Sequence, residues 1–144
     1  MINPRLYYLL SLLLVFIIPA FMVAYFVWER IPTINLILFV AGITVLGGIW
    51  DIWATRHGKR DPVWLWQFNF RDTLGIKLFD LPIEEYIFYL ASGIYIVFTW
   101  EAIRLALETK STLMFMLIPF LGLWSLLAIL IPYILKAKRD KLQR

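Results

Sequence analysis

The chain has 144 residues, of which 62% are hydrophobic, and its mean hydropathy is +0.78. A soluble domain holds only about 45–50% apolar residues, so the composition excludes a soluble globular fold and indicates a membrane protein. Cysteine is absent, which excludes disulfides and thiolate metal sites. The single histidine, His57, lies in a basic segment, which favours a solvated residue over a metal ligand. We therefore expect neither a metal nor a cofactor.

A membrane-spanning helix needs about 20 apolar residues. Four stretches reach that length: Leu6–Val27, Ile34–Trp53, Pro82–Trp100 and Thr112–Leu135. We predict an all-α integral membrane bundle with four transmembrane helices, forming a single domain over residues 1–144. The first stretch is too long and lacks the small-residue cleavage site of a signal peptide, so we expect it to remain as a helix.

The first two spans carry residues that shape helices. Pro19 removes a backbone hydrogen bond and predicts a kink in the first span. The short connection from Glu29 to Thr33 predicts that spans one and two are antiparallel neighbours. In the second span, Gly42, Gly47 and Gly48 would let another helix or a flat ligand approach the backbone closely.

The segment from Ala54 to Leu81 is the long connection of the chain. It places Trp64, Trp66, Phe68 and Phe70 at alternate positions, which predicts an extended segment with one aromatic face. Two interpretations stay open. The face is either a lid over a ligand or an aromatic belt at the level of the lipid headgroups.

The third span opens with two adjacent carboxylates, Glu84 and Glu85. Pro82 suits the first position of a helix, so both acids are predicted in its first turn, where free N–H groups and the helix dipole favour negative charge. That purely structural interpretation competes with a functional one, since a carboxylate close to the apolar part of a bilayer is costly and often marks function. Asp51, at the end of the second span, is either an interfacial charge or a third member of the same group.

Basic residues are unevenly distributed along the four-span topology. One side holds Arg5, Arg56, Lys59, Arg60, Arg71, Lys77, Lys136, Lys138, Arg139, Lys141 and Arg144, and the other holds Arg30, Arg104 and Lys110. The positive-inside rule then predicts a multi-pass protein of the cell membrane with both termini in the cytoplasm. The basic tail is explained by attraction to anionic lipid, without nucleic acid.

A set of short motifs resembles the membrane-type lycopene cyclases of carotenoid biosynthesis. The motifs are Gly48-Ile49-Trp50-Asp51, the aromatic segment from Trp64 to Phe70, Thr73-Leu74-Gly75-Ile76, and Leu81-Pro82-Ile83-Glu84-Glu85-Tyr86-Ile87-Phe88-Tyr89. The similarity covers residues 6–108 as a three-helix module and leaves residues 112–135 as an additional transmembrane helix.

The resemblance implies a carotenoid cyclase, an intramolecular lyase or isomerase that closes the end group of lycopene or a related linear polyene. A proton starts the reaction, and no net redox change occurs. Glu84 or Glu85 would be the acid, and Asp51 or the other glutamate would be the base. Burial in apolar surroundings favours a protonated carboxyl, as such an acid requires. The predicted substrate contacts are Trp50, Trp64, Trp66, Phe88, Tyr89 and Tyr95.

The family combines two such modules, so one module implies a homodimer or a heterodimer with a paralogous subunit. Two other functions stay open from the residues alone. A small dimeric proton-coupled transporter would use Glu84 or Glu85 as its proton site, and a non-catalytic membrane partner of carotenoid enzymes would need neither.

Overall fold

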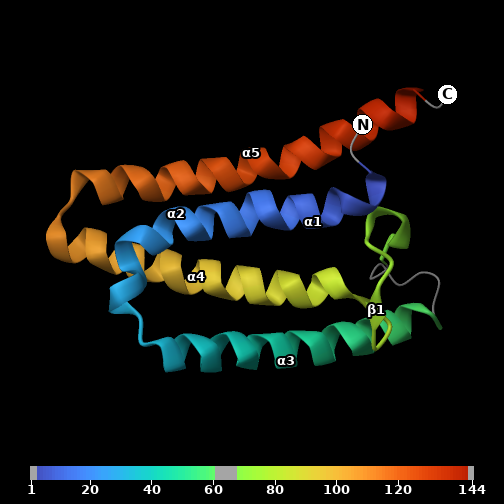
Figure 1. Ribbon diagram of the computed structural model, residues 1–144, viewed down its shortest axis with the longest axis horizontal. Coiled ribbons are helices and arrows are strands. Elements are labelled where there is room, and N and C mark those ends of the chain that lie inside the picture. The colour runs from blue at the N-terminus through green and yellow to red at the C-terminus, as the bar shows by residue number, and fades with distance from the viewer. Residues whose placement is uncertain (1–2, 61–67, 143–144) are drawn as a thin grey trace.

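The computed structural model describes residues 3–60 and 68–142 and consists of long helices arranged side by side. Figure 1 shows them in the spatial order α5, α1 with α2, α4 and α3. Their bounds are Tyr7–Leu12 for α1, Ile18–Val27 for α2, Thr33–Gly58 for α3, Ile83–Thr109 for α4 and Thr112–Leu142 for α5. Four helical segments of the described chain are long and apolar enough to cross a membrane, namely Tyr7–Arg30, Thr33–Gly58, Ile83–Thr109 and Thr112–Ile131. The predicted all-α bundle of four spans is confirmed.

The first span contains an irregularity just before Pro19. A single π-helical segment, Leu13–Ile17, joins α1 to α2, and a 3₁₀ turn, Trp28–Arg30, ends the span. Since Pro19 has no N–H, one carbonyl group in the preceding turn loses its usual donor. Side chains of α5 replace it. Trp124 Nε1 donates to Leu14 O at 2.8 Å, and Ser125 Oγ donates to Val15 O at 3.2 Å.

The central element is α4, which contacts every other long helix. Spans one and two run antiparallel, as predicted, but the prediction that they are neighbours is wrong, because α4 lies between α2 and α3 (Figure 1). Apolar side chains gain little from leaving lipid for each other, so small residues that allow close approach decide which helices pack together. The buried residues of α4 include several of this kind: Ala91, Ser92, Gly93, Ala102 and Ala106.

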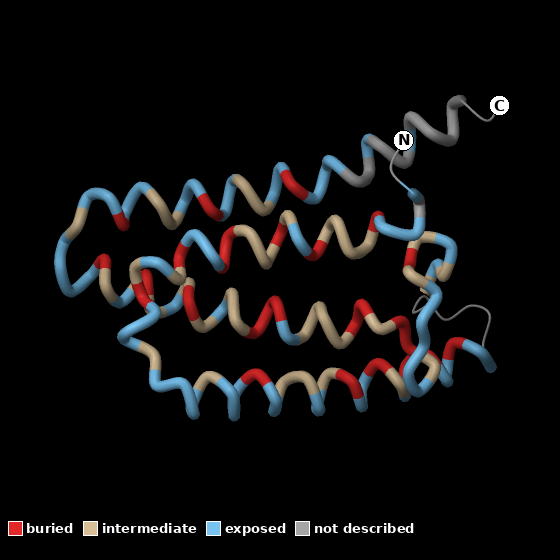
Figure 2. Tube along the Cα trace, viewed as in Figure 1, coloured by how far each residue is buried: buried red, intermediate tan, exposed pale blue. Residues whose placement is uncertain are grey.

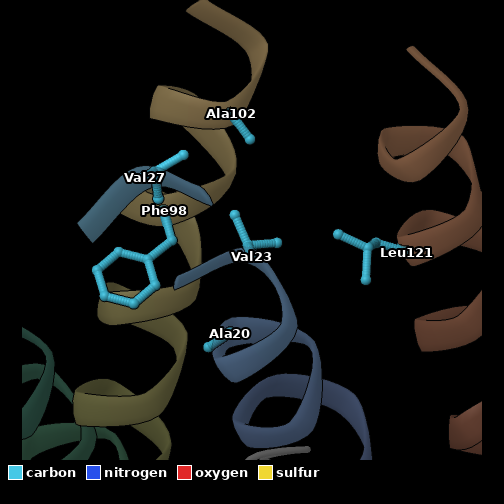
Figure 3. Close-up of a cluster of buried hydrophobic side chains, with 6 residues drawn as sticks. All are labelled: Ala20, Val23, Val27, Phe98, Ala102 and Leu121. Carbon is cyan, nitrogen blue, oxygen red and sulfur yellow. The ribbon is translucent and has the colours of Figure 1, made fainter. Parts of the chain in front are cut away.

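The buried core lies where α2, α4 and α5 meet. It consists of Ala20, Val23, Val27, Phe98, Ala102 and Leu121 (Figure 3). By contrast, α3 is buried mainly where it faces α4, and most of its remaining surface is exposed (Figure 2). In a bilayer that surface meets lipid or another protein.

A hairpin of two short strands, each of two residues, lies at one end of the bundle. Strand β1 (Lys77–Leu78) pairs antiparallel with β2 (Leu81–Pro82), with Lys77 opposite Pro82 and Leu78 opposite Leu81. The turn residues Phe79 and Asp80 have φ angles of 51° and 74°, in the left-handed region that such tight hairpin turns require.

The hairpin turn is tied to the end of α3 by charge. Lys59 Nζ lies 2.6 Å from Asp80 Oδ1, and Arg56 Nε lies 3.5 Å from Asp80 Oδ2. The hydrogen bond from Lys59 and its positive charge hold the pKa of the exposed Asp80 carboxyl below its ordinary value.

Pro82 belongs to the hairpin and not to the helix, so its predicted place at the first helical position is wrong by one residue. Its ψ of 144° is extended, and α4 begins at Ile83. The fixed φ of proline suits an extended strand as well as a helix, and here the pairing with Lys77 decides between them. The prediction that Glu84 and Glu85 lie in the first helical turn is confirmed.

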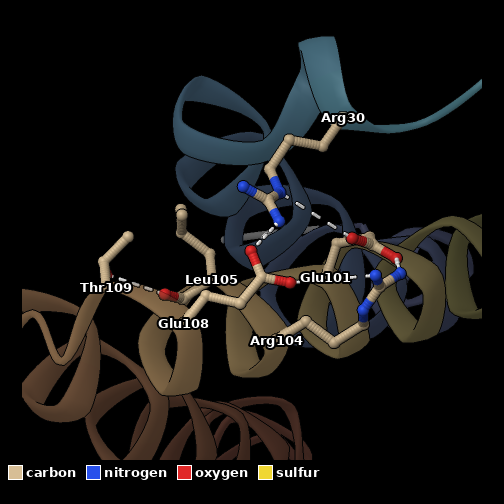
Figure 4. A network of polar contacts seen from close by, with 6 residues as sticks. All are labelled: Arg30, Glu101, Arg104, Leu105, Glu108 and Thr109. Atoms are coloured by element: carbon tan, nitrogen blue, oxygen red, sulfur yellow. Dashed lines mark hydrogen bonds and ion pairs between the residues drawn. The ribbon is translucent and has the colours of Figure 1, made fainter.

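At the opposite end of α4, arginines pair with glutamates (Figure 4). Arg30 donates to Glu108 and lies 3.9 Å from Glu101, and Arg104 lies 2.8 Å from Glu101. These contacts attach the end of the first span to α4. We call Arg30, Glu101, Arg104 and Glu108 the ion-pair network.

Candidate active site

Three carboxylates come together at the hairpin end of the bundle, and we call them the carboxylate cluster. Asp51 is near the C-terminal end of α3, and Glu84 and Glu85 open the antiparallel helix α4. Their exposed fractions are 1% for Asp51, 0% for Glu84 and 5% for Glu85. The helices thus bury the acids beside each other although Asp51 and Glu84 are 33 positions apart in the sequence.

Glu84 is held by the loop that precedes the hairpin. The backbone N–H of Leu74 donates to Glu84 Oε1 at 2.5 Å. Ile83 N donates to Ile76 O at 3.0 Å, which fixes the loop against the start of α4. The second oxygen, Oε2, is buried and has no hydrogen-bond partner among the described residues.

Two tyrosines hold the other two acids. The Tyr8 hydroxyl, from α1, donates to Glu85 Oε1. The Tyr89 hydroxyl donates to Asp51 Oδ2 at 2.7 Å, while Asp51 Oδ1 is buried without a partner in the described part of the chain. The ring of Tyr89 lies where a Cβ of Gly47 would be, so glycine at this position is what lets the ring approach α3 and reach Asp51.

No cation balances the carboxylate cluster in residues 3–60 and 68–142, whose ion pairs all involve other acids. The charges of Asp51 and Glu84 both act on Glu85, so the three groups are close enough to influence each other. Ionising all three in a buried place without a counterion is unfavourable. The arrangement can therefore hold a proton on a carboxyl group. In the same residues, no group of three or more metal-ligating side chains is arranged to hold a metal ion.

A family profile described as lycopene cyclase matches residues 4–103 of the chain. This match contains Asp51, Glu84 and Glu85 and covers most of the sequence. The chain belongs to the lycopene cyclase family. Comparisons with curated proteins and with solved structures gave no match.

Membership of the lycopene cyclase family makes this a carotenoid cyclase of the membrane, with a carotenoid as its substrate class. The family does not favour the transporter or the non-catalytic partner. The matched region ends within α4, so α5 (Thr112–Leu142) lies outside it.

The aromatic residues predicted around the cyclase substrate have different surroundings. Phe88 and Tyr95 both contact Phe16, edge to face, with centroid distances of 5.5 and 6.0 Å. Tyr89 is engaged with Asp51. Trp50 is 57% exposed and packs against Trp53 of its own helix, with centroids 5.1 Å apart. Trp64 and Trp66 lie outside the described residues.

The alternating aromatic segment is described only from Phe68 onward. Phe68 and Phe70 have ring centroids 6.4 Å apart, and a 3₁₀ turn, Phe70–Asp72, follows at once. This turn leads to Leu74, whose N–H binds Glu84. The described part of the loop thus serves the carboxylate cluster through its backbone.

Sequence reasoning missed Tyr8, Phe16 and the Leu74 N–H. Tyr8 is separated from Glu85 by 77 positions, and no spacing rule joins residues so far apart. Phe16 is in the π-helical segment, and such segments often occur at functional sites. Pro19 was the available signal for that irregularity.

Proposed function

We propose that this chain closes the end ring of lycopene or a related linear polyene by proton transfer, without net redox change. A carboxyl group gives its proton to the double bond nearest the chain end. The resulting tertiary cation is attacked by the next double bond along the chain, which closes the ring and leaves the positive charge on a ring carbon. Loss of a different proton, from a carbon beside that charge, leaves a cyclohexene. Product and substrate are isomers. The observation that carries this proposal is a set of three buried carboxylates in an apolar bundle, with no cation beside them in the described part of the chain.

The free carboxylate oxygens support an assignment of roles within the cluster. Glu84 and Asp51 each have one oxygen fixed by a donor and one buried oxygen without a partner in the described chain. A fixed oxygen orients the carboxyl group, and a free one is available for proton transfer. We assign Glu84 as the acid and Asp51 as the base. Glu85 is bound by Tyr8 and completes the cluster beside them.

The cation formed between these steps needs stabilisation without water. Aromatic faces provide it through cation–π attraction. Phe88 and Tyr95, with Phe16 against both, follow Glu84 along α4 and support this role. Trp64 and Trp66 remain proposed substrate contacts on the family resemblance. Trp50 would meet a substrate only at the exposed surface of α3.

We further propose that both termini face the cytoplasm and that the cyclase acts as a homodimer or with a paralogous subunit. The described ends of the chain lie at the same end of the bundle as β1 (Figure 1). The basic residues Arg56 and Lys59 are at that end too, in agreement with the positive-inside rule. The exposed apolar side chains of α3, among them Leu38, Val45 and Leu46, offer a surface for the second module.

Expression in a lycopene-producing host tests the proposed function. The chain should be produced alone and together with its natural partner, and the pigments should be separated by chromatography. We expect a cyclised product with the mass of lycopene. Unchanged lycopene in the presence of the partner would contradict the proposal.

A further inference from the structure

An apolar groove of about 260 Å³ runs along the first span and α4, away from the hairpin end. Side chains of both helices line it, and none is charged. Three are alanines, which let a ligand lie close to the helix backbones. The rim is aromatic, with Phe21 and Trp28 exposed by 74% and 56%. Its main lining residues are Ala20, Phe21, Ala24, Trp28, Ala91 and Phe98.

The groove lies on the same stripe of α4 as the carboxylate cluster. Ala91 and Phe98 follow Glu84 at successive intervals of seven residues, which is nearly two helical turns each. The rise from Glu84 to Phe98 is about 21 Å at 1.5 Å per residue.

Phe16 lies between the carboxylate cluster and the groove. It contacts Phe88 on one side and Tyr95 on the other, and Ile17 beside it already lines the groove. Along α4, Glu84 is followed by Phe88 and then by the groove residues from Ala91 to Phe98, with Tyr95 between them.

We propose that this groove binds the conjugated chain of the polyene whose end group reaches the carboxylate cluster. The inference rests on the proposed function. A linear polyene is flat and has no polar atoms, so it matches a groove with an alanine floor and aromatic rims. A linear polyene is also extended, so it can continue from the groove past the aromatic rings to the acids. A lipid acyl chain shares the apolar chemistry, but nothing in its structure would engage the buried acids.

Binding of lycopene to the full chain in lipid nanodiscs, followed by quenching of tryptophan fluorescence, tests this site. Ala24→Phe places a ring in the groove, and we expect it to weaken lycopene binding by about tenfold. The matched control is Ala41→Phe, because Ala41 is exposed on α3, away from the groove. We expect the control to bind lycopene like the unaltered chain.

Phe21→Ala provides a second variant that cannot fail through misfolding of the core, because Phe21 is 74% exposed. Loss of this rim should weaken lycopene binding by about threefold, whereas Phe115→Ala on α5, where the side chain is 48% exposed, should leave it unchanged. Unchanged lycopene binding in both groove variants, or equal weakening in the controls, would refute the proposal that lycopene binds in this groove. A lipid acyl chain would then be the occupant. Selective weakening in a chain that never cyclises lycopene would support the groove and refute the proposed function. Normal cyclisation with unaltered lycopene binding in both groove variants would support the proposed function and refute the groove as the polyene site.

Discussion

The two ends of α4 both carry a pair of acidic residues, and the bundle treats them in opposite ways. At one end, Glu101 and Glu108 pair with Arg30 and Arg104 in the ion-pair network, and Glu108 is half exposed. At the other end, Glu84 and Glu85 are buried beside a third acid, with hydrogen-bond donors but no cation in the described residues.

The difference separates structural acids from acids held for chemistry. A carboxylate that only anchors a helix end in a membrane is best neutralised by a cation. In the ion-pair network, arginines do this for Glu101 and Glu108. A buried carboxylate with uncharged partners keeps access to its protonated form. An enzyme that starts its reaction with a proton needs the second kind.

Removing the acid at the hairpin end should have the largest effect. We expect Glu84→Gln to lower the rate of ring closure by about 10²–10⁴-fold, since that is the usual contribution of a general acid. The amide oxygen still accepts from Leu74 N–H, so the chain should remain in the membrane. Chromatography of pigments gives the rate, and Glu108→Gln in the ion-pair network is the matched control. Full cyclisation by Glu84→Gln would refute the assigned acid.

Moving a partner of the carboxylate cluster should have the next largest effect. A Cβ on Gly47 would overlap the Tyr89 ring, so Gly47→Ala should displace the hydroxyl from Asp51 and lower the cyclisation rate by about tenfold, as for loss of a hydrogen bond to a charged group. Overpacking should also destabilise the chain by about 1–3 kcal/mol. Gly42→Ala is the control on the same helix, because nothing lies near its added Cβ. Equal rates for both variants would argue against the role of Tyr89.

Breaking the ion-pair network should lower the free energy of unfolding and leave the cyclisation rate unchanged. Arg30→Gln removes the cation between Glu101 and Glu108, and we expect a loss of about 1 kcal/mol in the free energy of unfolding. Thermal unfolding in detergent at low and high salt measures it, and the difference should shrink as salt screens the charges. A large loss of cyclisation in a folded Arg30→Gln chain would contradict the purely structural role given to the ion-pair network.

The smallest effect concerns Asp80, which is exposed in the hairpin turn and pairs with Arg56 and Lys59. Its pKa in the folded chain is lowered by Lys59 and Arg56. The ion pairs therefore stabilise the fold above the ordinary carboxyl pKa, and this contribution disappears as the pH falls through the lower folded value. Thermal unfolding between pH 3 and pH 7 should show an acid-dependent loss that is slightly smaller in Asp80→Asn. An identical pH dependence in that variant would exclude Asp80 as its source.

The spans and the pair of acids could be predicted from the sequence because both follow local rules. Span length comes from runs of apolar residues, and Glu84 and Glu85 could be placed in the first turn because proline is common at the start of a helix. The position of α4 between α2 and α3 could not be predicted. Short connections suggest neighbours, yet the small residues of α4 decided the packing.

The hydrogen bonds of the carboxylate cluster also escaped prediction. Tyr8 reaches Glu85 from the far end of the sequence, and Leu74 contributes a backbone group that no side-chain pattern reveals. Tyr89 was expected to contact substrate, whereas the structure shows it bound to Asp51. Such partners depend on how three helices and a loop meet, which the sequence of any one of them does not specify.

The bonds from Trp124 and Ser125 to the carbonyls around Pro19 have a consequence for anyone who shortens this protein. Inside hydrocarbon no water is available to replace a lost donor. A chain trimmed to its family-matched part would lose both of these donors next to Phe16. We therefore expect the fourth helix to stabilise the irregular turn of the first span, and a shortened chain to be less stable than the full one.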